Sequence, residues 1–149
     1  MKAIPKLFVL CIMLTMFQIS NAQVVKSARP YLFNNYGASL PATIAELDKA
    51  FLASQGSSIQ LQFAGNFSFS GTVSSSVQKY NNLSSVVIES PLLHNSVLAI
   101  SKRINDDNSI TYVGRIINES YADGYELKKD EKGNYAFNKI KTEDLIQDY

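Results

Sequence analysis

The chain of 149 residues carries a net charge of +1, and 46% of its residues are hydrophobic and 18% charged. Such a composition is typical of a globular protein and excludes the disordered and fibrous classes. The balance of charges also excludes the strongly basic surface with which proteins attract nucleic acids or anionic membranes.

The first 22 residues have the pattern of a secretory signal peptide. Lys2 and Lys6 precede an apolar run at residues 7–17, and small residues follow up to Ala22. The apolar run is too short for a membrane-spanning helix, which needs roughly 20 residues. We therefore predict cleavage after Ala22 and no transmembrane segment in the mature chain.

The mature chain contains no cysteine, because Cys11, the single cysteine, lies within the predicted signal peptide. A domain without thiols has no disulfide and depends on its hydrophobic core for stability. Export without disulfides is more typical of a bacterial protein than of a eukaryotic secreted domain. We therefore expect a periplasmic, cell-surface or secreted protein, whose net charge becomes about −1 when Lys2 and Lys6 are removed with the signal peptide.

Residues 23–39 are expected to form an extended N-terminal arm. Pro30 and Gly37 interrupt this segment, and its aromatic residues follow no helical or strand period. In this interpretation residues 40–149 form a single β-rich globular domain.

One α-helix is predicted after the arm. Leu40, Ile44, Leu47 and Phe51 recur at spacings of four, three and four residues, which places them on one face of a helix. The charged residues between them fall mostly on the opposite face. We expect the apolar face to pack on the rest of the domain.

Capping residues indicate the limits of this helix. Ser39 or Thr43 can serve as the N-cap, and Glu46 follows Thr43 by three residues, as in a capping box. Gly56 is the predicted stop signal beyond the last apolar position.

Beyond Gly56 apolar residues alternate with polar ones, which is the pattern of strands with one buried face. Ile59, Leu61 and Phe63 alternate with glutamines, and the apolar residues of segment 67–73 alternate with serines and threonine. Further strands are predicted at residues 85–89, 97–104, 109–117, 125–129 and 134–140.

Three-residue loops set the predicted register of two hairpins. Loops 64–66 and 106–108 each end in asparagine, which tolerates the left-handed conformation that a type I turn followed by a bulge requires. We therefore expect Asn66 and Asn108 to adopt this conformation. The predicted cross-strand pairs are Phe63 with Phe67, Leu61 with Phe69, Ile104 with Ile110, and Leu98 with Ile116.

The stretch GYELKKDEKGNYAF, residues 124–137, combines aromatic and charged residues and is either a binding platform or a hairpin with a buried aromatic face. A three-residue loop at 131–133, with Gly133 in the left-handed conformation, places its four large apolar side chains on one face. We therefore predict the hairpin. The prediction pairs Leu127 with Phe137 and Lys129 with Tyr135, and it buries Leu127, Phe137 and at least half of Tyr125 and Tyr135.

These elements predict an α+β fold that is mostly β. One N-terminal helix packs on a curved antiparallel sheet or partly open barrel of about seven strands, because the strands follow one another without βαβ alternation. A two-sheet β-sandwich is the alternative. A short C-terminal helix is predicted from Thr142, which precedes two acids as an N-cap residue does.

The sequence contains none of the common catalytic or metal-binding motifs. His94 is the single histidine and, in a mature chain without cysteine, it cannot build a typical zinc site, so we interpret it as a polar loop residue. The serines of segment 68–76 have no evident neighbouring base and fit a solvated strand. Acidic residues concentrate in predicted turns, where they serve solubility and turn hydrogen bonds. We therefore predict no catalytic residue, no metal and no cofactor.

Tyr121 and Asp123 are the predicted binding residues, because an aromatic ring beside a carboxylate in an exposed turn can contact a ligand. The favoured function is a non-enzymatic interaction or structural module that binds a protein or glycan partner at the cell envelope. The alternative is a carboxylate-based hydrolase acting on envelope polymers, which requires two carboxylates across a cleft. A third hypothesis is strand addition at residues 68–76, which would then form an exposed sheet edge.

Overall fold

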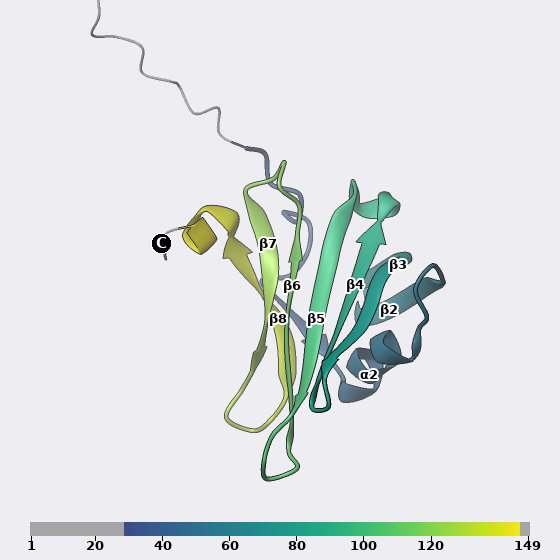
Figure 1. Cartoon of the computed structure of the whole chain (residues 1–149). Helices are drawn as coiled ribbons and strands as arrows, with labels where there is room; N and C mark the ends of the chain where they lie inside the picture. Colours follow the sequence, from purple (N-terminus) through teal and green to yellow (C-terminus); the bar gives the residue numbers. More distant parts are fainter. Residues whose placement is uncertain (1–28, 147–149) are drawn as a thin grey trace, which may run out of the picture.

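The computed structural model describes residues 29–146, so the predicted signal peptide and its cleavage site lie outside the described residues. Within these residues eight strands, one α-helix and two short 3-10 helices follow one another (Figure 1). No helix among them is long and apolar enough to cross a membrane. The elements are β1 (Ser39–Ala42), α2 (Ile44–Leu52), β2 (Ser58–Ala64), β3 (Phe67–Tyr80), β4 (Leu83–Ser90), η1 (Pro91–Leu93), β5 (Ser96–Ile104), β6 (Ile110–Ile117), β7 (Asp123–Lys129), β8 (Tyr135–Lys141) and η2 (Thr142–Ile146).

All eight described strands belong to one antiparallel sheet, in the order β1-β8-β7-β6-β5-β4-β3-β2. The sheet curls into a nearly closed barrel, so that the end strands β1 and β2 approach each other beside helix α2 (Figure 1). The predicted fold, one helix on a curved antiparallel sheet or partly open barrel, is therefore confirmed. One sheet rather than two excludes the β-sandwich alternative. The strand missing from the prediction is β1.

The helix is shorter than the sequence predicted, because Leu40 belongs to β1. Leu40 is buried and Pro41 is exposed, which is the alternation of a strand, and a proline is tolerated in β1 because this strand ends the sheet. Ile44, at the start of the helix, is 54% exposed and takes no part in the apolar face. Leu47 and Ala50 form the buried part of that face.

The N-cap prediction is confirmed at Thr43 and is wrong at Ser39, which lies in β1. Thr43 Oγ1 accepts a hydrogen bond from Glu46 N at 3.2 Å. The Glu46 carboxylate turns to β2 instead of back to the cap, and it accepts from Gln62 N at 2.9 Å, so the capping box is not reciprocal. Gly56, with a φ of 84°, lies in the turn beyond the helix rather than ending it.

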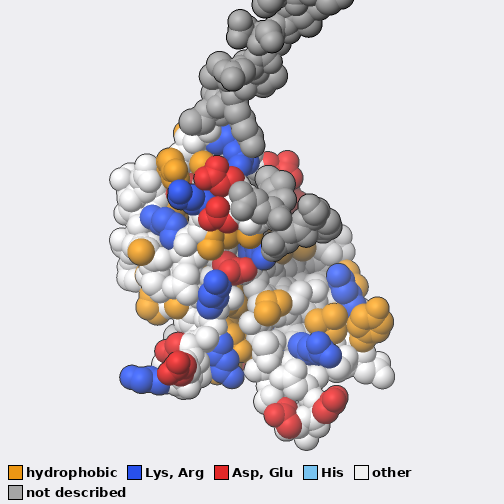
Figure 2. All heavy atoms as spheres, turned by 90° about the vertical axis from the view of Figure 1, so that its left-hand side faces the viewer, with side chains coloured by type: hydrophobic (Ala, Val, Ile, Leu, Met, Phe, Trp, Pro, Cys, Tyr) orange, Lys and Arg blue, Asp and Glu red, His pale blue; other side chains and the backbone are white. Residues whose placement is uncertain are grey.

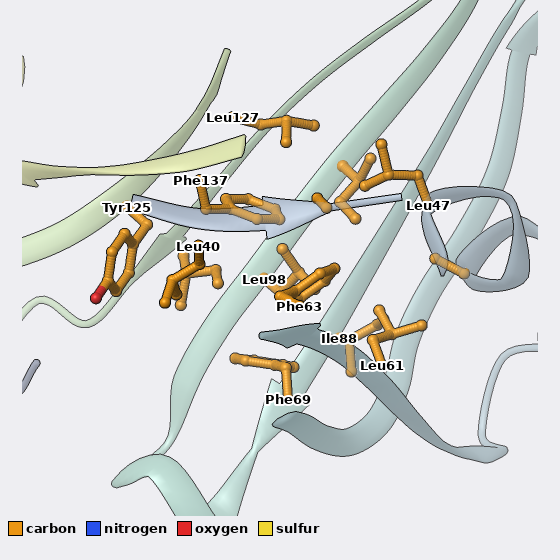
Figure 3. Packing of buried hydrophobic residues seen from close by; sticks show 14 of the residues in the cluster. Leu40, Leu47, Leu61, Phe63, Phe69, Ile88, Leu98, Tyr125, Leu127 and Phe137 are labelled. Atoms are coloured by element: carbon orange, nitrogen blue, oxygen red, sulfur yellow. The ribbon is translucent and has the colours of Figure 1, made fainter. Parts of the chain in front are cut away.

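Aromatic and aliphatic side chains fill the inside of the barrel. Figure 3 shows side chains from strands of both halves of the sheet pointing toward one another, with Leu47 reaching in from α2. The ring centroids of Phe63 and Phe137 lie 4.7 Å apart. Because burial of each large apolar side chain contributes about 1.5–3 kcal/mol, this core can stabilise a domain without disulfides. The largest fully buried side chains are Tyr125, Phe33, Phe67, Phe69, Phe137, Leu40, Leu47, Leu61, Ile88, Leu98, Ile100 and Ile116.

The predicted registers of the β5–β6 and β7–β8 hairpins are confirmed. Asn108 has a φ of 63° and Gly133 a φ of 88°, so each loop has the left-handed residue at the predicted position. Asn66, in the β2–β3 loop, does not have a positive φ, and that prediction is wrong. The segment 124–137 is a hairpin rather than an aromatic binding platform, because its large apolar side chains face the core. The observed pairs are Ile104 with Ile110, Leu98 with Ile116, Leu127 with Phe137, and Lys129 with Tyr135, and Tyr125, Leu127, Tyr135 and Phe137 are all buried.

The β2–β3 hairpin differs from the prediction at its loop. Phe67 pairs with Ala64 rather than with Phe63, because the register shifts at the residue between Gln62 and Ala64. In the observed register Phe63 and Phe67 both face the core, where their ring centroids lie 6.5 Å apart. The hairpin therefore has a two-residue loop at 65–66 and a bulge at Phe63 instead of the predicted three-residue loop. The more distant pair, Leu61 with Phe69, is confirmed.

β3 lies between β2 and β4 in the sheet, but strand addition at residues 68–76 stays a hypothesis, because these residues pair on both sides only at Thr72. Its first half pairs with β2 up to Thr72, and its second half pairs with β4 from Thr72 onward.

Candidate functional site

Asp123, one of the two predicted binding residues, begins β7 and is only 1% exposed. Its carboxylate accepts hydrogen bonds from Leu32 N at 2.7 Å and from Phe33 N at 2.9 Å, two amides of the N-terminal arm. The Phe33 ring is thereby held in the core, where its centroid lies 5.1 Å from that of Tyr125. Asp123 therefore fastens the arm to the barrel, and both of its carboxylate oxygens are engaged.

Tyr121 is half-buried at the same end of the barrel, with its ring centroid 5.8 Å from that of His94. Its N–H donates to Asn118 O at 3.1 Å, and its carbonyl oxygen accepts from Thr142 Oγ1 at 3.0 Å. Thr142 begins η2, so the predicted C-terminal helix is present with 3-10 geometry and is tied to this turn. A ligand contact by Tyr121 stays a prediction.

A second group of polar side chains joins helix α2 to the barrel. Lys102 Nζ of β5 lies 2.5 Å from Asp48 Oδ1, and the Tyr112 hydroxyl of β6 donates to the same oxygen at 2.6 Å. Burial opposes ionisation of Asp48, but the hydrogen bonds from Lys102 and Tyr112 outweigh it and lower its pKa. Burial, followed by the hydrogen bond to Asp48, raises the pKa of Tyr112.

These pKa shifts do not suit acid–base catalysis. A general acid or base is most effective when its pKa lies near the working pH. Near neutral pH Asp48 is ionised and Tyr112 is protonated, so neither group exchanges a proton readily. A polar hollow of about 250 Å³ beside Lys102 has no carboxylate in its lining. We conclude that this group attaches the helix to the barrel.

Five hollows in the surface of residues 29–146 lack the paired carboxylates of a hydrolase. Each of these hollows is lined by at most one carboxylate. Glu126 lines one of them, Glu119 lines two, and the other two have none. A glycoside hydrolase requires two carboxylates roughly 5 to 10 Å apart. Within the same residues no three His, Cys, Asp or Glu side chains gather where they could hold a metal ion.

The outer face of the sheet carries an apolar groove over β5, β6 and β7, which we call the outer groove. It has a volume of about 450 Å³, and aliphatic side chains form much of its lining. Val113 of β6 is 56% exposed, whereas the solvated face of an antiparallel sheet ordinarily carries polar residues. The lining of the outer groove includes Val97, Ala99, Val113, Arg115, Ile117 and Glu126.

Three charged side chains border the outer groove. Glu126 Oε1 lies 3.0 Å from Arg115 Nη2, and Glu126 Oε2 lies 3.0 Å from Lys128 Nζ. The hydrogen bonds from Lys128 and Arg115 lower the pKa of Glu126, so its carboxylate is ionised at neutral pH. Two cations thus share one anion and leave a net positive charge at the border. Arg115 and Lys128 are each about half-exposed and remain accessible to an acidic partner.

Strands β6 and β7 separate beside the outer groove. Over the described strands β5 and β6 pair without interruption, whereas the register of β6 with β7 comprises two pairs. Figure 2 shows the surface hollowed between two lobes at the lower end of the molecule, where the β5–β6 and β7–β8 hairpins turn in Figure 1. The two β6–β7 pairs are Arg115 with Glu126 and Ile116 with Tyr125.

We call the space between residues 110–114 of β6 and residues 127–129 of β7 the β6–β7 seam. A side chain replaces a strand partner here, because Tyr112 N donates to the Tyr135 hydroxyl of β8 at 3.2 Å. The seam adjoins the outer groove, whose lining includes Gly114 of β6. An exposed apolar surface and an incompletely paired strand edge therefore lie next to each other.

Sequence reasoning predicted the strand that carries much of the outer groove, but it did not predict the groove. The predicted strand 109–117 has apolar residues on both faces, since Ile116 faces the core while Val113 and Ile117 face outward. A strand with one solvated face normally alternates apolar with polar residues. Aliphatic residues on both faces were thus the signal that could have indicated an outer binding surface.

Comparisons with known protein families, with curated proteins and with solved structures found no match. The structure therefore defines the class of protein by architecture alone. It is a mostly β domain in which one short helix flanks a nearly closed antiparallel barrel with a filled interior. The features that bear on function are the outer groove and the β6–β7 seam.

Proposed function

We propose that this protein is an exported, non-enzymatic interaction module that binds a protein partner at the cell envelope through the outer groove. The observation that carries the proposal is the exposed aliphatic lining of the groove, with Val113 56% exposed. Apolar surface bordered by charged side chains is typical of sites where proteins contact one another. The signal-peptide pattern of residues 1–22 supports export.

The lining of the outer groove favours a polypeptide over a glycan. Sugars are commonly held by exposed aromatic rings that have polar groups around them. The groove instead presents valine, alanine and isoleucine side chains. A hydrolase would need a second carboxylate beside Glu126, and the lining of the groove contributes one carboxylate.

Photo-crosslinking from the outer groove tests this function. A benzophenone amino acid replaces Val113 in the full-length protein, which is expressed in its own organism, and crosslinked products are identified by mass spectrometry. The same replacement at Val77, a 48% exposed valine of β3, is the matched control. We expect a protein to crosslink from position 113 and not from position 77.

The identified partner is then purified and its binding measured in solution. Val113→Glu places a charge in the apolar lining and should weaken binding by about tenfold or more. Val77→Glu should bind like the wild type, and circular dichroism checks that both variants are folded. Equal binding by both variants, or glycan binding that Val113→Glu leaves unchanged, would show that the outer groove is not the functional surface.

A further inference from the structure

We infer that the β6–β7 seam accepts an extended segment of the partner protein, which pairs with the free edge of β6 as an added strand. The inference rests on the proposed function, because it specifies how the partner occupies the outer groove. In strand addition, backbone hydrogen bonds provide affinity and alternate side chains enter adjacent pockets. The seam offers the backbone edge, and the outer groove next to it offers the apolar contact surface.

The backbone groups that face the seam follow from the register of the β5–β6 hairpin. Asn105 N donates to Ser109 O at 2.8 Å, so these two residues form a hydrogen-bonded pair. Successive pairs of an antiparallel ladder alternate between hydrogen-bonded and non-hydrogen-bonded. Ile110, Tyr112 and Gly114 therefore direct their N–H and C=O groups away from β5 and toward the seam. The direction of the Tyr112 N–H described above agrees with this assignment.

Side chains of α2 protect the edge of β2 against pairing with another chain, whereas a tyrosine hydroxyl, that of Tyr135, meets the edge of β6 at the seam. Lys49 Nζ of α2 donates to Gln60 O of β2 at 2.7 Å. The Glu46 carboxylate accepts from Gln62 N of β2 at 2.9 Å, so helix side chains cover this edge. The pairing of β3 with β4 has two register shifts, and bulges of this kind hinder edge pairing. β6, in contrast, is in continuous register with β5.

The Tyr135 hydroxyl acts as an internal substitute for a strand partner. It accepts from Tyr112 N at 3.2 Å, at the long end of the range for such hydrogen bonds. An added segment whose carbonyl reaches the Tyr112 N–H must displace this hydroxyl. Binding then exchanges one hydrogen bond for another at this position, so removal of the hydroxyl should favour the added segment.

The groove and its border define the chemistry of the added segment. Its outward side chains would lie beside Val113, at the end of the outer groove next to the seam, so these positions favour aliphatic residues. Arg115 and Lys128 share the single carboxylate of Glu126, so one positive charge can pair with the segment. The occupant is therefore an extended segment of about five residues, with aliphatic residues at alternate positions and at least one acid.

Selection from a display library tests this inference on the exported protein. Random peptides of about twelve residues, long enough for one strand, are selected on the wild type in the presence of soluble Val113→Glu protein as competitor. Enriched peptides are synthesised and titrated calorimetrically, and amide hydrogen exchange is followed by NMR. We expect alternating aliphatic sequences that carry an acid, and slower exchange at Ile110 and Gly114 when they bind.

Matched variants locate the peptide. Tyr135→Phe should bind it about fivefold more tightly, the equivalent of one net hydrogen bond. Lys128→Glu should weaken acid-containing peptides, whereas Lys132→Glu, at an exposed lysine of the β7–β8 loop, should not. Val77→Glu should bind like the wild type. Urea unfolding of each variant identifies any that is not folded. Val113 is exposed, so Val113→Glu should fold and still test the inference if Tyr135→Phe does not fold.

Three results overturn the inference: no enriched peptide, equal binding to Val113→Glu and the wild type, or an unchanged affinity in folded Tyr135→Phe. Its failure is distinguishable from failure of the proposed function. A partner that crosslinks from position 113 but slows no exchange in β6 retains the proposed function and removes strand addition. Absence of any groove-dependent protein partner removes both.

Discussion

Replacement of Asp123 by alanine should release the N-terminal arm and destabilise the domain. The buried carboxylate accepts hydrogen bonds from Leu32 N at 2.7 Å and Phe33 N at 2.9 Å. A hydrogen bond to a charged group contributes about 1.5–3 kcal/mol. Loss of both bonds in Asp123→Ala should therefore lower the free energy of unfolding by about 3–6 kcal/mol, out of the 5–15 kcal/mol that is roughly typical of a domain.

A graded variant and a control sharpen this measurement. Asp123→Asn keeps one acceptor oxygen but turns an NH₂ group toward the second backbone N–H, so we expect a loss of about 1.5–3 kcal/mol. Asp106→Ala removes an exposed acid from the β5–β6 loop and should stay within about 0.5 kcal/mol of the wild type.

Two assays separate local release of the arm from global unfolding. Urea unfolding followed by circular dichroism gives the free energies by linear extrapolation. Chymotrypsin reports on the arm, because Phe33 is a cleavage site that is fully buried while the arm is docked. Cleavage should be fastest in Asp123→Ala, slower in Asp123→Asn and slowest in the wild type. An Asp123→Ala protein as stable and as resistant as the Asp106→Ala control would refute the fastening role.

Three further predictions concern the loops, the alkaline stability and the mature terminus. Gly133→Ala should cost about 1–2 kcal/mol in urea unfolding because a side chain at a φ of 88° is strained, whereas Gly65→Ala, with open space at its Cβ position, should be nearly neutral. Burial, followed by the Asp123 carboxylate, raises the pKa of Tyr125 from 10.0 to about 12. The unfolded chain loses this proton first, so the stability contributed by Tyr125 is complete below about pH 10 and is lost as the pH rises to about 12. The urea midpoint should fall over this window, and it should fall less in Tyr125→Phe. Mass spectrometry of the exported protein should find Gln23 as its first residue, and retention of residues 1–22 would contradict the predicted signal peptide.

The hairpin registers could be predicted from the sequence because they depend on local features. Asn108 and Gly133 supply the left-handed residue at the third loop position. The apolar residues on each side favour the same register, since a slip by one residue would turn Phe137 toward water. Where the loop residues and the hydrophobic pattern favour the same register, the sequence is enough to predict that register.

The two errors in the fold concern the start of the helix and the β2–β3 hairpin. The spacing from Leu40 to Phe51 fits a helix, yet Leu40 pairs with Phe137 of β8 and is buried as a strand residue. In the β2–β3 hairpin, a bulge at Phe63 shortens the loop to residues 65–66 and makes Ala64 the partner of Phe67. The partner of Leu40 lies far along the chain, so the residues around Leu40 do not reveal it.

The β6–β7 seam could not be predicted, because it depends on where two adjacent strands separate. The ring centroids of Tyr112 and Tyr135 lie 5.4 Å apart with perpendicular planes, and the Tyr135 hydroxyl takes the place of a β7 carbonyl at Tyr112 N. These tyrosines lie on β6 and β8, with β7 between the two strands in the sheet. The seam is thus a consequence of long-range packing between the two hairpins.

The filled interior of the barrel explains why we place the function on its outside. Phenylalanine, tyrosine and aliphatic side chains from strands around the barrel meet inside it, so the arm, the helix and the sheet enclose a core rather than a ligand (Figure 3). An unprotected strand edge beside apolar surface is ordinarily a liability, because it invites pairing with other chains. This chain covers the edge of β2 with Lys49 and Glu46 but leaves the edge of β6 next to Val113. That difference is explained if a partner segment covers β6 in the assembled complex.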